Sequence, residues 1–254
     1  MKISALLGLM ALLIATTANA NMPCSQATLN GRYVITSRSD LTSPVAVALV
    51  GLIDFDGRGH VRSVSTMSRD GVTAANYTLI GTYTVNANCA YTQTATNSTG
   101  GIEHAAGVIA DEGERLLLIG TEPNAYATSD ALRLERTSCD ALPAATYAAR
   151  GLMLFSPSGP ETHVSTVRAD AAGNLLITDS TTNLGAVVST GGSGTARLLL
   201  RPDCSISMAT TDGGAHYVGV ARVTDGHIGL YLVGTDPGIT VFYTALGTPS
   251  DQAE

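Results

Sequence analysis

Hydrophobic and polar residues follow one another in short runs along this chain, and glycine, aspartate, asparagine and proline separate the runs. His60–Arg69 alternates in the manner of a strand, through Val61, then Ser63 or Val64, and then Thr66. The preceding Asp56-Gly57-Arg58-Gly59 predicts a hairpin turn, because glycine adopts positive φ without steric cost. The same pattern predicts strands over 29–37, 45–55, 60–69, 76–85, 89–96, 102–110, 115–121 and 126–134.

The second half of the chain repeats the first with an offset of about 114 residues. Tyr33 aligns with Tyr147 and Asp56 with Asp170, and 118–123 (LIGTEP) matches 232–237 (LVGTDP). We therefore predict two copies of one domain, at 21–136 and 137–254. The second copy is expected to have strands near Tyr147, Thr162, Asn174, Gly185, Thr195, Cys204, His216, His227 and Thr240, two of which merge.

Eight short strands in each copy, without an amphipathic helix, predict an all-β fold of two tandem eight-stranded antiparallel barrels. A single sixteen-stranded outer-membrane barrel is the alternative. The absence of Trp, the presence of only three Phe and the ending Asp-Gln-Ala-Glu argue against the aromatic girdles of such barrels. The run 45–53 is almost continuously apolar, which is typical of a strand buried on both faces. We expect its outer face to pack against the second copy.

Four cysteines divide equally between the two copies. Cys24 and Cys89 are 65 residues apart, and so are Cys139 and Cys204. Because an even number of cysteines in an exported chain usually forms disulfides, we predict one bridge within each copy. Free thiols or bridges between the copies are the alternatives.

The first copy carries Gly31-Arg32-Tyr33, then Phe55-Asp56-Gly57-Arg58-Gly59, and then Gly81-Thr82-Tyr83-Thr84-Val85 shortly before Cys89. This pattern resembles exported bacterial proteins with lipocalin-like (calycin-type) barrels. The second copy matches more loosely, and no Trp stands at the first strand, where true lipocalins have one. The resemblance implies a barrel, in which an interior pocket can hold a small ligand.

Residues 1–20 have the pattern of a secretory signal, in which Lys2 precedes an apolar run and Ala18-Asn19-Ala20 supplies the cleavage site. The apolar run is too short to span a membrane. We therefore expect a periplasmic or secreted protein. Cleavage removes the only lysine and leaves 13 Arg against 21 Asp and Glu, a net charge of −8. Such an acidic chain is not expected to bind nucleic acid. Because the cleaved chain has no lysine, Schiff-base chemistry through a lysine amine is excluded.

Residues for catalysis are not evident in the sequence. The histidines have no metal-ligand spacing, and Gly191-Gly192-Ser193-Gly194 lacks the arrangement of a hydrolase nucleophile. We predict neither a metal site nor a cofactor. Asp56 and Asp170 are expected to cap turns. His104 and His216 recur three residues before Gly-Val, and one hypothesis places each imidazole inside its barrel, beside Tyr91 or Tyr217, to orient a ligand.

Three functions remain open from the sequence. The first is binding of a small, mostly apolar ligand. The second is a structural or interaction module of the cell envelope or extracellular matrix, with two equivalent surfaces for a protein partner. The third is a cofactor-free barrel isomerase or cyclase.

Overall fold

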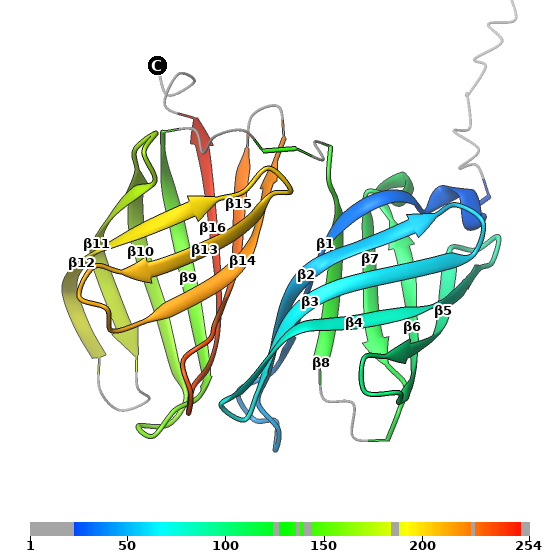
Figure 1. Ribbon diagram of the computed structural model, residues 1–254, viewed down its shortest axis with the longest axis horizontal. Helices are drawn as coiled ribbons and strands as arrows, with labels where there is room; N and C mark the ends of the chain where they lie inside the picture. The colour runs from blue at the N-terminus through cyan, green and yellow to red at the C-terminus, as the bar shows by residue number, and fades with distance from the viewer. Residues whose placement is uncertain are drawn as a thin grey trace, which may run out of the picture.

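The computed structural model describes residues 23–123, 127–135, 138–139, 144–183, 188–224 and 227–249. It contains two closed antiparallel barrels of eight strands each, which lie side by side (Figure 1). The first barrel is built from β1 (Asn30–Ser39), β2 (Val47–Asp56), β3 (His60–Arg69), β4 (Val72–Val85), β5 (Ala90–Asn97), β6 (Ile102–Ala110), β7 (Arg115–Gly120) and β8 (Ala127–Arg133). The second is built from β9 (Ala145–Phe155), β10 (Glu161–Ala169), β11 (Asn174–Asn183), β12 (Val188–Leu200), β13 (Ser205–Thr210), β14 (His216–Val223), β15 (Ile228–Gly234) and β16 (Thr240–Pro249). The predicted fold class is confirmed.

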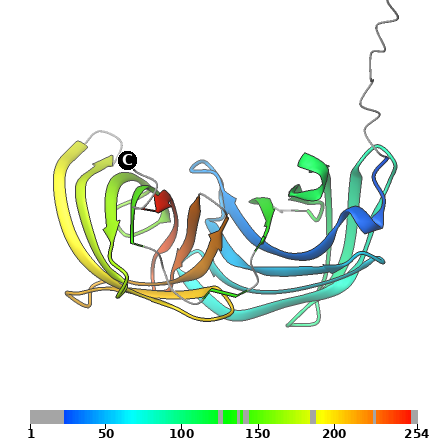
Figure 2. The ribbon, with the colours of Figure 1, turned by 90° about the horizontal axis from the view of Figure 1, so that it is seen from above.

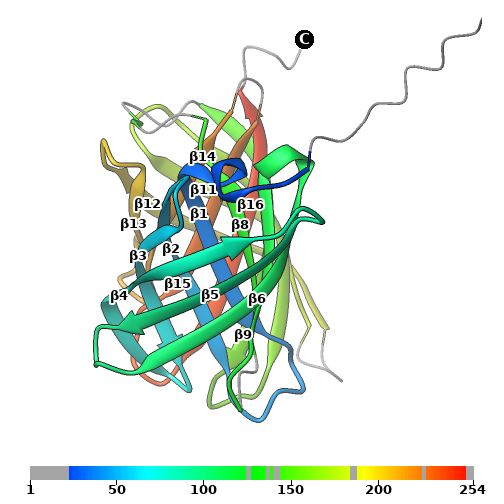
Figure 3. The same ribbon diagram turned by 90° about the vertical axis from the view of Figure 1, so that its right-hand side faces the viewer.

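Each barrel closes by pairing its first strand with its last. β1 pairs with both β2 and β8, and β9 pairs with both β10 and β16. Figure 3 shows the first barrel from its own side. A single sixteen-stranded barrel is therefore excluded. Two short 3-10 turns, η1 (Gln26–Thr28) and η2 (Asp111–Gly113), accompany the strands of the first barrel. Within the described ranges, no helix has the length and apolar character needed to cross a membrane.

The strand bounds differ from the prediction mainly at β4. This strand begins at Val72, four residues before the predicted start, because Asp70 and Gly71 form a tight turn with positive φ angles of 49° and 78°. In the second copy, β12 includes the segment predicted near Thr195. The segment predicted near Gly185 and the predicted signal at 1–20 lie outside the described residues.

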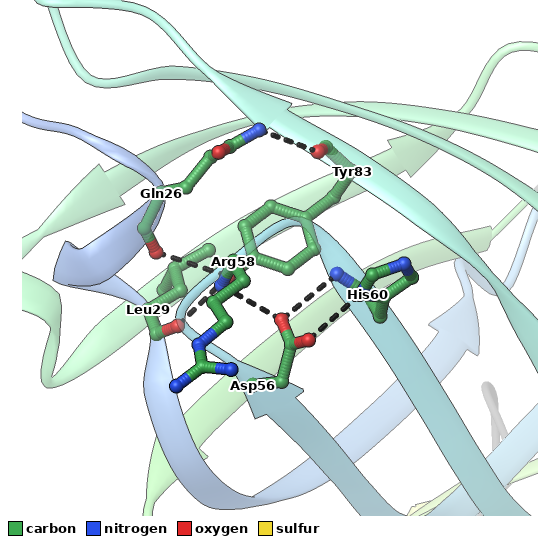
Figure 4. Close-up of polar contacts among 6 residues, drawn as sticks. All are labelled: Gln26, Leu29, Asp56, Arg58, His60 and Tyr83. Carbon is green, nitrogen blue, oxygen red and sulfur yellow. Dashed lines mark hydrogen bonds and ion pairs between the residues drawn. The ribbon is translucent and has the colours of Figure 1, made fainter.

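The two repeated aspartates stabilise equivalent hairpin turns, as predicted. Asp56 accepts hydrogen bonds from the backbone N–H groups of Arg58 (2.7 Å) and His60 (2.9 Å), as Figure 4 shows. Asp170 accepts the corresponding pair from Ala172 and Asn174, both at 2.9 Å. These donors stabilise the charged form, and the bond from the His60 amide is the largest cause that lowers the pKa of Asp56 to about 2.

Both predicted disulfides are present, one in each barrel. Cys24–Cys89 ties the segment before β1 to the turn between β4 and β5. Cys139–Cys204 makes the equivalent link in the second copy, before β9 and between β12 and β13. Because each bridge stays within one copy, the disulfides fix each barrel independently of the other.

Four aromatic rings fill the disulfide end of the first barrel. Phe55 lies at their centre and makes edge-to-face contacts with Tyr33, Tyr83 and Tyr91, with ring centroids 5.2–6.1 Å apart. Tyr83 also stacks on Tyr91 at 5.7 Å. All four side chains are fully or almost fully buried, so this end of the barrel has a packed core.

The η1 segment covers the same end of the barrel (Figure 4). The hydroxyl of Tyr83 donates to the backbone carbonyls of Gln26 and Leu29, both at 2.9 Å. Leu29 is completely buried and packs in the same apolar core as the rings. The chain before β1 therefore closes the barrel mouth rather than leaving it open to a ligand.

The outer face of β2 packs against the second barrel, as expected from its continuous apolar sequence (Figure 2). Along β2, Ile53 and Phe55 belong to the core of the first barrel. The alternate residues Ala48 and Val50 share a core with side chains of the second barrel. Strand β2 contacts β14, β15 and β16, and every residue of β15 is buried. Burial on both faces thus joins the two barrels through a continuous apolar core.

Hydrogen bonds reinforce this contact where the β3–β4 turn meets the β15–β16 turn. The buried hydroxyl of Thr240 accepts from the Gly71 amide at 2.8 Å and lies 3.0 Å from the Ser68 hydroxyl. The Gly238 amide donates to the Gly71 carbonyl at 2.9 Å. A side chain at position 71 would collide with Gly238, because a Cβ there would lie 2.8 Å from its backbone.

The repeated tyrosines Tyr33 and Tyr147 offer a matched test of one hydrogen bond. Both are completely buried, but the Tyr33 hydroxyl donates to the Gly113 carbonyl at 2.8 Å, whereas among the described residues the Tyr147 hydroxyl has no partner. We expect Tyr33→Phe to lower the free energy of unfolding by about 1–2 kcal/mol, because it leaves a buried carbonyl unpaired. Tyr147→Phe should have no effect or stabilise. Urea denaturation measures both, and equal losses would contradict the assignment.

Candidate functional site

The two recurring histidines lie on the outside of their barrels. His104 is 48% exposed and forms an ion pair with Glu122, and His216 is 55% exposed and lies 2.8 Å from Asp236. On β6 the neighbouring Ala105 packs toward the core, so His104 points the other way. The predicted placement of both imidazoles inside the barrels is therefore wrong. A role for them in ligand binding stays a prediction that this placement does not support.

The two tyrosines predicted beside them do face the barrel interiors. Tyr91 is buried among the aromatic rings, and its hydroxyl donates to the side chain of Gln93. Tyr217 makes an edge-to-face contact with Tyr243, with centroids 5.5 Å apart. Tyr91 is thus a packed core residue, whereas Tyr217 belongs to a polar cluster in the second barrel.

That cluster lies at the end of the second barrel away from its disulfide. His163 bonds to the hydroxyl of Thr182 through Nδ1 at 2.8 Å, and its Nε2 lies 3.3 Å from a carboxylate oxygen of Glu161. The imidazole ring lies 6.0 Å from the ring of Tyr243. Burial raises the pKa of both Tyr217 and Tyr243, so their hydroxyls stay protonated. The interior histidine of this barrel is therefore His163 rather than His216.

The residues of this cluster are not repeated in the first copy, where a different polar group occurs: the Tyr77 hydroxyl and the Asn97 amide both donate to Glu103. At the repeat offset, His163 corresponds to Leu49, Glu161 to Val47 and Tyr243 to Ser129. Leu49 packs against the apolar core of its barrel. The two copies have kept one fold while their interiors have diverged in chemistry.

Within the described part of the chain, no group of three or more His, Cys, Asp or Glu side chains is arranged to hold a metal ion.

A groove of about 690 Å³ lies between the two barrels. Its first wall is the outer face of β1, β6, β7 and β8, and its second wall comes from β9, β15 and β16. The second wall consists of Arg150, Tyr231, Phe242 and Thr244. Neither copy could form this groove by itself, because each supplies only one wall.

The first wall of the groove is apolar and exposed. Val108, Leu117 and Ile119 are 51%, 39% and 53% exposed, respectively, although they are large hydrophobic side chains. Phe242, which is almost completely buried, belongs to the second wall of the same groove. Exposed apolar side chains that gather in a concave surface typically mark a binding site.

Charged residues in the groove are mainly arginines. Arg38, Arg115 and Arg150 line it together with one carboxylate, Asp130. Arg115 is already paired, since its Nε and Nη2 donate to the two oxygens of Asp130 at 3.0 and 2.5 Å. The groove therefore has two positive charges in excess, in a chain whose net charge is −7.

Arg38 and Arg150 carry that excess. The Arg38 guanidinium lies 5.8 Å from the centroid of the Phe242 ring, and Arg150 Nε donates to the hydroxyl of Thr244 at 3.1 Å. Neither forms an ion pair with a carboxylate of the described residues. Burial, and then the charge of Arg150, lowers the pKa of Arg38. The two guanidinium groups thus repel each other across the groove.

Sequence patterns do not identify these two arginines as a pair, because they lie on β1 and β9 of different copies. Searching for outward-facing arginines on strands would have found Arg38 and Arg150, but it would equally have found Arg62 and Arg168. Only the docking of the barrels distinguishes the first two.

Comparison with known proteins does not place the chain in a family. No family model and no curated protein matches it. Among solved structures, a DUF3598-family protein of unknown function from Nostoc punctiforme aligns at 12% identity with a TM-score of 0.26, over 90% of this chain and 100% of its own. Kievitone hydratase from Nectria haematococca aligns at 8% identity with a TM-score of 0.24, over 91% and 94%. At such low TM-scores neither likeness bears on function, and the lipocalin-like resemblance stays a prediction.

Proposed function

We propose that this protein is an exported binding protein that holds a small, mostly apolar ligand in the groove between its two barrels. The observation that carries the proposal is the groove itself, whose volume is within the range of about 300–1,000 Å³ that is usual for small-molecule sites. Exposed Val108, Leu117 and Ile119 would gain burial from an apolar ligand. The two disulfides are consistent with export, because such bridges persist in oxidising compartments.

The packing of the barrels supports one site rather than two equivalent ones. The first copy uses β2 and β3 for the contact, whereas the second uses β14, β15 and β16. The outer surfaces that remain free therefore differ between the copies, which is unfavourable for a module with two equal binding surfaces. An isomerase site inside the second barrel is the second candidate, and the observation that favours it is the cluster of Glu161, His163, Tyr217 and Tyr243.

Titration with decan-1-ol tests the proposal. Calorimetry should give one bound molecule per chain and a negative heat-capacity change, because apolar surface is buried. Thr128→Trp should weaken binding by about tenfold or more, since Thr128 is an exposed residue of the groove lining and the indole would occupy the space. Thr82→Trp is the matched control, because Thr82 is also an exposed strand threonine but lies outside the groove.

Three outcomes would contradict the groove as the site. Two equivalent bound molecules would point to the barrel interiors instead. Equal weakening by Thr128→Trp and Thr82→Trp would indicate an effect on folding rather than on the groove. Loss of binding in His163→Ala, with Thr128→Trp unaffected, would move the site into the second barrel.

A further inference from the structure

We infer that the ligand of the groove carries an anionic headgroup, such as a carboxylate or a phosphate, which binds between Arg38 and Arg150. This inference rests on the proposed function, since it concerns the same groove. It adds the chemical class of the ligand, an amphipathic anion rather than a neutral apolar molecule.

The first argument is the excess positive charge. Arg115 has its carboxylate in Asp130, whereas Arg38 and Arg150 form no ion pair with a carboxylate of the described residues, and Asp130 offsets the charge of Arg38 only in part. Holding two like charges close together costs free energy that a bound anion would recover. Guanidinium groups also present several N–H donors in a planar fork, which suits carboxylate and phosphate oxygens.

The second argument is the surroundings of Arg38. This side chain is half-buried, and its guanidinium lies over the ring of Phe242. Screening by water is weaker in such a position than at the open surface, so an anion would be attracted more strongly. The Phe242 ring also restricts where the guanidinium can move, which reduces the entropy lost on binding.

The third argument is the strand register, which places an apolar surface next to the arginine. Arg38 pairs with Thr128 on β8, and Thr128 pairs with Ile119 on β7. Leu117 and Val108 follow on the same outer wall, where they pair with each other. A headgroup at Arg38 would therefore have its tail on Ile119, Leu117 and Val108.

Four ten-carbon probes with different headgroups test the inference: decanoate, decyl phosphate, decan-1-ol and decylamine. We expect both anions to bind the wild-type protein about tenfold or more tightly than the alcohol, and the amine to bind most weakly. The advantage of the anions should shrink as salt is added, because the interaction is electrostatic. Arg38→Gln and Arg150→Gln should each reduce the advantage, and the double variant should abolish it by weakening the two anions far more than decan-1-ol.

Arg62→Gln is the control, since Arg62 is exposed on β3 and lies outside the groove, and it should leave all four affinities unchanged. Arg38→Gln and Arg150→Gln should be about as stable as the wild type, because each removes one of two positive charges that repel each other. Equal affinity for decanoate and decan-1-ol would overturn the headgroup inference and leave the proposed function standing. Failure of every probe to bind would overturn the proposed function itself. Loss of alcohol binding in Arg38→Gln would overturn the headgroup role, because the arginine would then be shaping the groove.

Discussion

Replacing Cys139 and Cys204 by alanine is expected to lower the free energy of unfolding by about 4 kcal/mol. The bridge closes a loop over 65 residues, and the chain-entropy model attributes its effect to the unfolded chain, which gains conformations when the bridge is lost. Urea denaturation of the variant against the oxidised wild type measures the difference.

The first copy provides the matched comparison. Cys24–Cys89 closes a loop of the same sequence separation, so the corresponding double alanine variant should lose a similar free energy. A midpoint unchanged by either replacement would contradict the prediction. A much larger loss in the second copy would show that packing contributes beyond chain entropy, since Cys204 is completely buried whereas Cys24 is partly exposed.

Ala48→Asp is expected to separate the two barrels and to lower the free energy of unfolding by about 3 kcal/mol or more. Ala48 is completely buried, on the face of β2 that contacts the second barrel. A carboxylate there would be removed from water without a partner, which is costly. We expect the wild type to unfold in one transition and the variant in two, which urea denaturation followed by limited proteolysis would resolve.

Ile80→Asp is the control for the interface. Ile80 lies on β4 and is 59% exposed, so the same change should alter the stability by only about 0.5 kcal/mol. If Ala48→Asp were as mild as Ile80→Asp, the contact between the barrels would contribute little to stability. The groove would then vary in width, and the binding proposal would lose its basis.

The sequence pattern predicts the strands of each barrel, but it does not predict which side chains come together in the folded protein. Alternation along a strand identifies two faces, but it does not say which of several outward histidines, tyrosines or arginines meets another element. The prediction that His104 and His216 orient a ligand rests on their recurrence at the same position of each copy. Such recurrence reflects the shared ancestry of the copies as readily as a shared role. His163 has no counterpart in the first copy, where Leu49 stands, so comparison of the copies could not find it.

The sequence by itself determined the duplication and the approximate strands, and it predicted the pairing of the cysteines that the structure confirms. These depend on local alternation, on turn residues such as Asp56 to Gly59 and on a constant offset, all of which are visible along the chain. It also indicated that 45–53 is buried on both faces. Only the tertiary structure decided what covers that strand and where the groove lies. The physical reason is that Arg38, Ile119, Arg150 and Phe242 are outward-facing residues of separate strands, and they become one site only when the two closed barrels pack against each other.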